Sequence, residues 1–233
     1  MKSKKIKFIP SNEEVFNKLD IPKPGTKYVP DWYKKSNRFI GGEMAIGETG
    51  INKDIKLCHP FLDAMTAGYL YELSSDLIVE KENGAYKFVW ADTPQTIQFR
   101  SKDMAKLLPR PAGHARDMFA WVMPHGPLTP SGYSCLVTHP LNRWDLPFTT
   151  TSGIMESDNY SVPGEVPFFF KNDFEGVISA GTPIIQVIPF KRENWKSEKS
   201  VYDLGFLERQ MHQIHKSLYG GYKKLFWVKK SFE

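Results

Sequence analysis

The carboxylates best placed to do chemistry stand close together in the second half of the chain. Glu156 and Asp158 are two residues apart, so on a strand their side chains would project to the same side. Tyr160 follows as an aromatic platform, beside which a carboxylate can orient a water molecule or a sugar hydroxyl. Further along, Gly181 permits a turn and Gln186 offers an amide able to read a base or a backbone. We therefore take Glu156 and Asp158 as candidate catalytic residues.

Other catalytic patterns are missing from the sequence. There is no GxSxG elbow and no Walker or Rossmann glycine pattern. Glu208, His212 and His215 follow the spacing i, i+4, i+7, which could bring three ligands to a metal ion. We interpret them instead as the polar flank of an amphipathic helix. No cofactor is expected, and magnesium would enter only together with a bound nucleotide.

Composition indicates a soluble globular protein. The 233 residues are 41% hydrophobic and 24% charged, which is enough chain to bury a sizeable core. No stretch approaches the ~18 apolar residues of a spanning helix, and the basic N-terminus lacks the apolar region of a secretory signal. The two cysteines, Cys58 and Cys135, form no CxxC motif. We expect a cytoplasmic protein without a membrane partner.

Charge is distributed unevenly along the chain. Residues 51–190 hold 11 Lys and Arg against 15 Asp and Glu, whereas residues 191–233 hold 10 against 5. The C-terminal lysines alternate with aromatic residues around Trp227, a pattern compatible with nucleic-acid binding or with a closing segment that has a solvated cationic edge. We favour the closing segment, so nucleic acid is not an expected partner.

The patterning predicts a mainly β protein in three parts. Residues 1–50 form an irregular N-terminal arm broken by prolines, with one short helix capped by Ser11 and with Trp32 and Tyr33 as anchors. Residues 51–190 form a β-rich body of antiparallel strands. Its expected strands are Tyr69–Leu73, Asp76–Glu80, Tyr86–Trp90, Thr96–Arg100, Phe119–Met123, Tyr133–Thr138, Val166–Phe170 and Ile184–Phe190.

Residues 191–233 change character to a C-terminal helix and an extended tail. The helix is expected over Asp203–Ser217, ended by Gly220 and Gly221. Its apolar stripe is predicted to be buried against the body. The stripe consists of Leu207, Met211, Ile214 and Leu218.

Two segments resemble the dUTPase and dCTP deaminase (β-clip) superfamily. That superfamily carries a Gly-Val-Ile-Asp-x-Asp-Tyr-like element and, later, a Gly-x-x-Ile-Ala-Gln element. Gly153-Ile-Met-Glu-Ser-Asp-Asn-Tyr160 is similar to the first with one extra residue, and Gly181-Thr-Pro-Ile-Ile-Gln186 is similar to the second. The resemblance implies a dUTPase-like antiparallel β fold.

The resemblance also implies roles for single residues. Glu156 would stand in place of the water-activating Asp, Tyr160 would contact the deoxyribose and Gln186 would lie near the base. Where the superfamily has Arg-Ser-Ser for the phosphates, this chain has His139, Pro140, Leu141 and Asn142, followed by Arg143. His139, Asn142 and Arg143 are therefore the candidate phosphate ligands, without the hydroxyl donors of Arg-Ser-Ser.

Most of the chain also resembles a bacteriophage-associated family. The resemblance rests on Pro-Asp-Trp-Tyr-Lys near the start and Gly-Tyr-Lys-Lys-Leu-Phe-Trp near the end. It implies no activity.

Three functions remain open from the sequence. The first is a binding or accessory protein on a dUTPase-like fold without pyrophosphatase activity, and this is the one we favour. The second is a nucleotide pyrophosphatase or deaminase-like enzyme, and the third is a phage virion or assembly component. The partner would be a nucleotide or a protein, and a homo-oligomer is compatible with each function.

Overall fold

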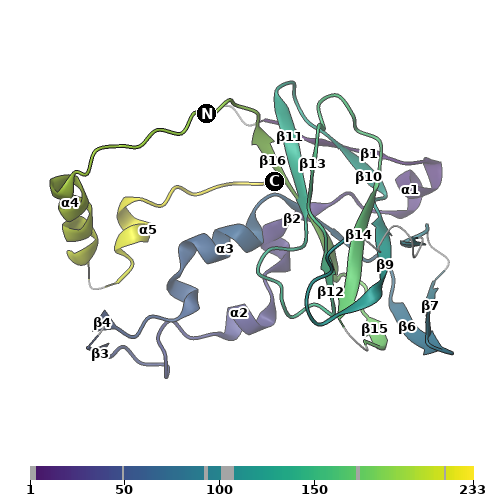
Figure 1. The fold of residues 1–233 in the computed structure, drawn as a ribbon, viewed down its shortest axis with the longest axis horizontal. Helices are drawn as coiled ribbons and strands as arrows, with labels where there is room; N and C mark the ends of the chain where they lie inside the picture. The colour runs from purple at the N-terminus through teal and green to yellow at the C-terminus, as the bar shows by residue number, and fades with distance from the viewer. Residues whose placement is uncertain (1–3, 49, 92–93, 101–107, 172–173, 218) are drawn as a thin grey trace.

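The computed structural model describes residues 4–48, 50–91, 94–100, 108–171, 174–217 and 219–233. The chain is mainly β, as the sequence predicts, and every strand pairing among the described residues is antiparallel. Figure 1 shows the larger sheets gathered at one end of the molecule, and the helices α2–α5 and the small β3–β4 pair extending to the other.

A five-stranded sheet has β16 at its centre. The strand order is β13-β11-β16-β5-β2, and β16 pairs with β11 on one side and with β5 on the other. The strands are β2 (Lys23–Pro24), β5 (Tyr69–Glu72), β11 (Tyr133–Thr138), β13 (Gly153–Met155) and β16 (Pro183–Lys191). Gly68 enters β5 with φ of +67°, and a Cβ there would lie 2.0 Å from the carbonyl oxygen of Val187. Only glycine therefore allows the chain to start β5 so close to β16.

Two further sheets complete the β body. One has the order β12-β14-β9-β8 and consists of β8 (Ile97–Phe99), β9 (His114–Val122), β12 (Phe148–Thr150) and β14 (Glu165–Lys171). The other has the order β15-β6-β7 and consists of β6 (Leu77–Glu82), β7 (Ala85–Trp90) and β15 (Gly176–Ile178). Two small pairs are β1 (Lys7–Pro10) with β10 (His125–Leu128), and β3 (Ile46–Gly47) with β4 (Gly50–Ile51).

Aromatic side chains fill the core between these sheets. Phe168 of β14 stacks on Trp121 of β9 with ring centroids 3.8 Å apart, and Phe148 meets both rings edge-on. All three side chains are fully buried. The facing sheet adds Val137, Ile185 and Val187, so the core joins strands from residues 69 to 191. Alternation along the predicted strands, with one face apolar, dictates this arrangement.

The N-terminal arm contributes ordered elements to the body. The β1 and β2 strands pair with β10 and β5, and Tyr33 is buried against Phe61. The sequence predicts Ser11 as the N-cap of the first helix. That prediction is wrong, because the N-cap is Asn12. The Asn12 side chain accepts a hydrogen bond from the N–H of Val15 at 2.9 Å, which satisfies one of the free donors of the first turn.

Short helices lie outside the sheets. They are α1 (Glu13–Lys18), α2 (Asp31–Lys35), α3 (His59–Thr66), α4 (Leu204–His215) and α5 (Gly221–Leu225), with 3-10 turns at Gly25–Tyr28 and Ile55–Leu57. The helix α3 lies inside the segment predicted as β-rich and was not predicted. The helix α5 stands at the start of the segment predicted to be an extended tail.

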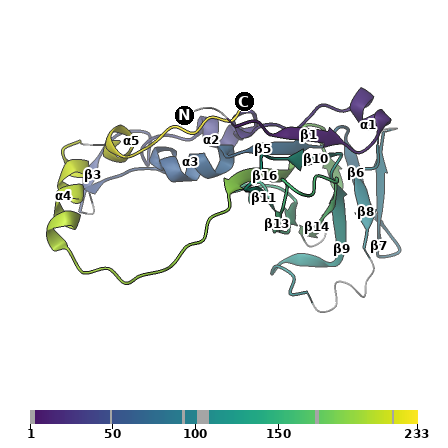
Figure 2. The same ribbon diagram turned by 90° about the horizontal axis from the view of Figure 1, so that it is seen from above.

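The prediction that the stripe of α4 is buried on the body is wrong. The helix forms where expected, with Asp203 as its N-cap, but it contains no buried residue, and Leu207 and Met211 are each about half exposed. Leu218 lies outside the described residues. Figure 2 shows the reason: residues 192–203 carry α4 away from the sheets, to the far end of the molecule beside α5.

The stacked pair in the core sets a first test. Phe168→Ala is expected to lower the free energy of unfolding by roughly 3–5 kcal/mol, because it leaves a cavity beside Trp121 that the sheets cannot close. Phe16→Ala, at a ring that is 72% exposed on α1, is the matched control, with an expected change of about 0.5 kcal/mol or less. Urea denaturation measures both, and equal losses would contradict this account of the core.

Candidate functional site

The two candidate catalytic carboxylates converge on an arginine that the sequence analysis did not single out. Glu156 and Asp158 lie in the turn after β13, where the N–H of Tyr160 donates to the carbonyl of Glu156 at 2.9 Å. Arg192, just after β16, donates to both carboxylates. Asp158 also accepts from the N–H of Gly132, and Glu156 accepts from the hydroxyl of Ser134, each at 2.8 Å.

The ion pair with Arg192 keeps Asp158 charged. The hydrogen bond from Arg192 is the largest influence on Asp158 and lowers its pKa to about 2, while the pKa of Arg192 is raised in return. A general base works best with a pKa near the operating pH and with a free lone pair toward the substrate. Asp158 has neither, so this cluster ties the β13 turn to the end of β16.

Gln186 is fully buried in the centre of the five-stranded sheet. Its side-chain oxygen accepts from the N–H of Leu141 at 2.7 Å, and its NH₂ group donates to the carbonyls of Ala64 and Ala67 at 2.9 and 2.7 Å. Both donors of the amide are used inside the protein. Gln186 thus holds the end of α3 and the turn after β11 against the sheet.

The candidate phosphate ligands are also paired within the protein. The Nδ1 atom of His139 accepts from the N–H of Thr150, and Nε2 lies 3.1 Å from the carbonyl of Arg143. Burial, above all, lowers the pKa of His139, which favours the neutral ring that this arrangement needs. Asn142 donates to the carbonyl of Phe61 at 3.0 Å.

Arg143 completes the same turn. Its guanidinium binds both carboxylate oxygens of Asp145, and it donates to the carbonyl of Tyr28 at 3.4 Å. This bidentate pair uses the guanidinium N–H donors that a phosphate would otherwise bind.

The structure places the candidate residues in two separate groups. Ser134, which binds Glu156, is opposite Phe190 in the β11–β16 register, whereas Gln186 is opposite Thr138. Four residues along a strand correspond to about 13 Å. The resemblance places Glu156 and Gln186 in one nucleotide site, and the sequence predicts that the turns at Gly153 and Gly181 bring them into one cleft; the β11–β16 register separates them, so this prediction is wrong. Tyr160 is 58% exposed, and Gly181 lies apart, in a turn with φ of +79°.

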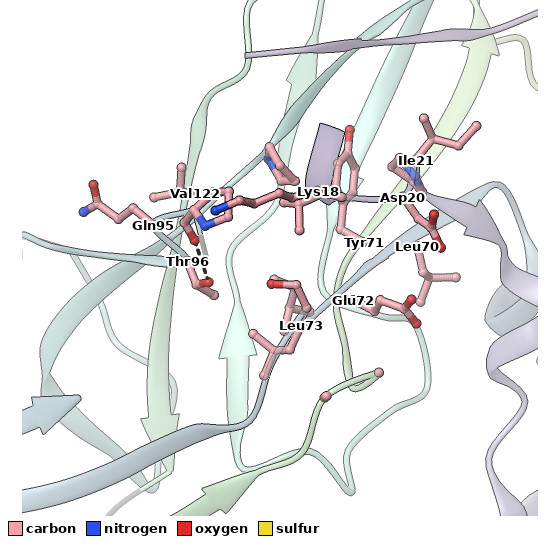
Figure 3. A pocket seen from close by; sticks show the side chains of 18 of the residues that line it. Lys18, Asp20, Ile21, Leu70, Tyr71, Glu72, Leu73, Gln95, Thr96 and Val122 are labelled. Carbon is pink, nitrogen blue, oxygen red and sulfur yellow. Dashed lines mark hydrogen bonds between the residues drawn. The ribbon is translucent and has the colours of Figure 1, made fainter. Parts of the chain in front are cut away.

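Gly181 does line a pocket of about 520 Å³ (Figure 3). Its buried floor comes from the β body, and its polar rim comes from the end of α1 and the segment after it, from the end of β5 and from the residues before β8. The floor includes Leu70, Tyr71, Leu73 and Ile184, and the rim includes Lys18, Asp20, Glu72, Gln95 and Thr96. A pocket with an apolar floor and few polar groups is typical of small-molecule sites.

Glu72 is the polar group held most firmly in this pocket. Its carboxylate accepts from Lys23 Nζ at 2.5 Å and from the hydroxyl of Tyr28 at 2.7 Å. The hydrogen bond to Glu72 is the largest cause that raises the pKa of Lys23, and burial followed by the same carboxylate raises the pKa of Tyr28. Lys23 therefore stays charged and Tyr28 keeps its proton, so both continue to orient Glu72.

Opposite charges stand on opposite sides of the pocket. In Figure 3, Lys18 extends toward Gln95 and Thr96, while Glu72 and Asp20 lie on the other side. No motif in the sequence connects Glu72 with Lys23 or Tyr28, because Glu72 is 49 residues from Lys23 and 44 residues from Tyr28. The arrangement can orient a dipolar molecule.

Comparisons with known proteins assign no family. No family model, no curated protein and no solved structure matches the chain. Among the described residues, no helix is both long and apolar enough to cross a membrane, and no group of three or more His, Cys, Asp or Glu side chains is arranged to hold a metal ion.

The buried amide sets a second test. Gln186→Leu is expected to cost about 3 kcal/mol or more of unfolding free energy, because three backbone groups of Ala64, Ala67 and Leu141 lose their partner. Gln213→Leu on the exposed side of α4 is the control, with an expected change within about 0.5 kcal/mol. Denaturation curves check both, and a tolerated Gln186→Leu would show that the amide is free for a ligand.

The Arg192 cluster sets a third test, on pH. Because the pKa of Asp158 is lowered in the folded state to about 2, its contribution to stability is present above the ordinary Asp value of about 4 and is lost as pH falls toward 2. The stability difference between the wild type and Asp158→Asn should stay constant from neutral pH to about 4 and shrink below it. Glu48→Gln, at an exposed loop position, should show no such window. A difference that persists unchanged to pH 2 would contradict the ion pair.

Proposed function

We propose that this chain is a binding or accessory protein that holds a small dipolar molecule in the pocket beside Glu72, without pyrophosphatase activity. The observation that carries the proposal is the Glu72 carboxylate, oriented by Lys23 and Tyr28 at the wall of a pocket of about 520 Å³. Its dUTPase-like character, a nucleotide ligand and an association with bacteriophage stay predictions within this proposal.

The contacts of the sequence candidates support a binding role over the alternative of a nucleotide pyrophosphatase or deaminase-like enzyme. For that chemistry Glu156 would have to leave Arg192, and Gln186 would have to leave the backbone groups that it binds. Arg143 would in addition have to leave Asp145 to reach a phosphate. Each release breaks charged or buried hydrogen bonds worth about 1–3 kcal/mol.

The pocket chemistry defines the class of ligand. Its volume lies within the range of about 300–1,000 Å³ that small-molecule sites occupy. A ligand ammonium or another N–H donor would face Glu72 and Asp20, and a carboxylate would face the Lys18 ammonium, which also pairs with Glu14 at 2.9 Å. Free amino acids combine both groups at this size.

Calorimetric titration tests the proposal. The purified protein is titrated with free amino acids, with the matching amines and carboxylic acids, and with nucleosides. We expect an amino acid to bind and the singly functional compounds to bind less tightly. Glu72→Gln keeps the shape of the side chain and removes the charge, so it should weaken binding roughly 10- to 100-fold.

Glu165→Gln is the control for the titration. Its carboxylate pairs with Arg100 at 2.6 Å on another sheet, outside the pocket lining, so binding should not change. In parallel, nucleoside triphosphates with magnesium should release no phosphate. Turnover that Glu156→Gln abolishes would overturn the binding role in favour of the enzyme. If no compound of the panel binds in a way that depends on Glu72, the pocket is not the ligand site that we propose.

A further inference from the structure

The chain after β16 leaves the body as an exposed arm. We call residues 192–225 the C-terminal arm; it comprises an extended strap, residues 192–203, followed by α4 and α5. Every residue of the strap is exposed, and Trp195 is 87% exposed. The large apolar side chains exposed along the arm are Trp195, Val201, Tyr202, Leu204, Phe206, Leu207, Met211, Tyr219, Tyr222 and Leu225. So many on one segment are typical of an interaction surface.

The strap also leaves its backbone unpaired. Among the described residues, no hydrogen bond is made by the backbone of residues 193–202, although the strands on either side of β16 are fully paired. Figure 2 shows the strap arching away from the rest of the molecule. Twelve extended residues reach up to about 40 Å, which is comparable with the width of a small domain.

The helix α4 presents one apolar stripe to solvent. Leu204, Leu207 and Met211 follow the spacing i, i+3, i+7 and share a face, and each is about half exposed. Ile214 is half-buried, and a Cβ on Gly221 would lie 2.5 Å from its carbonyl oxygen, so α5 begins close against the end of α4. A twelve-residue helix gains most of its stability from packing its apolar face, so we expect this stripe to pack against another surface.

Both ends of the C-terminal arm are fastened to the chain's own body. At the start, Arg192 is held by Glu156 and Asp158. Beyond the end, Trp227 Nε1 donates to Asp63 at 2.8 Å, and Lys230 Nζ pairs with the same carboxylate at 2.6 Å. The exposure of the arm therefore belongs to a segment fixed at both ends and not to a loose terminus.

A matching surface lies at the other end of the molecule, on the three-stranded sheet. Ile78 is opposite Val89 in the β6–β7 register and opposite Val177 in the β15–β6 register. These three side chains, which we call the β6 face, are 37%, 44% and 56% exposed. Alternation along the strands puts their neighbours Leu77, Val79 and Ile178 into the core.

The charges around the two surfaces are complementary. Four carboxylates lie on or beside the β6 face against two lysines; they are Asp76, Glu80, Glu82 and Glu175, against Lys81 and Lys87. The C-terminal arm carries the opposite excess, with 7 Lys and Arg against 4 Asp and Glu in residues 192–225. The two surfaces lie at opposite ends of one molecule (Figure 1), so they can meet only between copies.

We propose that the C-terminal arm of one copy docks its α4 stripe on the β6 face of a second copy of this chain. The contact joins different patches, so reciprocal exchange gives a closed dimer and repeated addition gives a ring or a chain. The second copy is favoured over another protein because this one chain supplies both an apolar stripe on an arm with a basic excess and an apolar face with an acidic excess.

Light scattering over a dilution series tests the contact. The wild type should show a mass that is a multiple of the 26.8 kDa chain. Met211→Glu should shift it to the monomer, because the new carboxylate meets the acidic β6 face, and Val177→Lys should do the same, because the new lysine meets the basic arm. Mixing these two variants should restore association, since the unchanged arm of the Val177→Lys copy then meets the unchanged β6 face of the Met211→Glu copy, and in the other contact the introduced charges attract.

Gln213→Glu is the matched control for Met211→Glu. It adds the same charge to an exposed position on the opposite side of α4, so the mass should not change. Circular dichroism keeps the test independent of folding, because all variants should retain the wild-type spectrum. A wild type that is monomeric at every concentration would overturn the proposal, as would an oligomer that survives both Met211→Glu and Val177→Lys.

Cross-linking locates the contact. In a Cys58→Ser background, which removes the exposed thiol, Met211→Cys mixed with Val177→Cys should form a disulfide-linked dimer under mild oxidation. Gln213→Cys mixed with Val177→Cys should not. Equal cross-linking of the two mixtures would contradict docking through the α4 stripe.

Discussion

The stacked aromatic layer between the sheets is the constraint on which the rest of the structure depends. Phe168, Phe170, Trp121 and Phe148 can leave water only if β9, β12 and β14 face the five-stranded sheet. The adjacent Phe169 is buried on the other face of β14, so that strand is covered on both sides. Polar groups at this layer must then pair internally, as Trp121 Nε1 does with the hydroxyl of Thr150 at 3.2 Å. The loops and arms occupy the positions that this layer leaves free.

Side chains that could do chemistry serve instead to attach segments to this core. Gln186 binds three backbone groups of α3 and the turn after β11, and Arg192 fastens the β13 turn. Leaving a buried amide unpaired destabilises the folded state by more free energy than a hydrogen bond contributes. The oxygen and the NH₂ group of Gln186 are accordingly all hydrogen-bonded within the protein. Other side chains face the pocket or the solvent: Glu72, oriented by Lys23 and Tyr28, lines the pocket, and the apolar side chains of the C-terminal arm and the β6 face are exposed. A binding role follows more naturally from these groups than a catalytic one does.

The two proposals use separate parts of the molecule. The pocket is formed within one chain by the segment after α1 and the ends of β5 and β16, whereas the C-terminal arm requires a second chain. Loss of one site would leave the other intact, since no residue of the arm or of the β6 face lines the pocket. An assembly that presents several copies of a small-molecule pocket is compatible with an accessory role.

The sequence by itself determined the mainly β class, the position of eight of the sixteen described strands and the helix after Asp203, because alternation, turn residues and capping are local properties. It did not show α3, whose residues His59–Thr66 carry weak local signals and are held by Gln186 from far along the chain. It grouped Glu156 with Gln186 through the resemblance to the dUTPase superfamily, but the β11–β16 register separates them. It also predicted a buried stripe on α4, since an amphipathic pattern says that a face needs a partner without saying which one. Only the tertiary structure decided which side chains are paired and which remain free, because pairing depends on residues distant in sequence meeting in space.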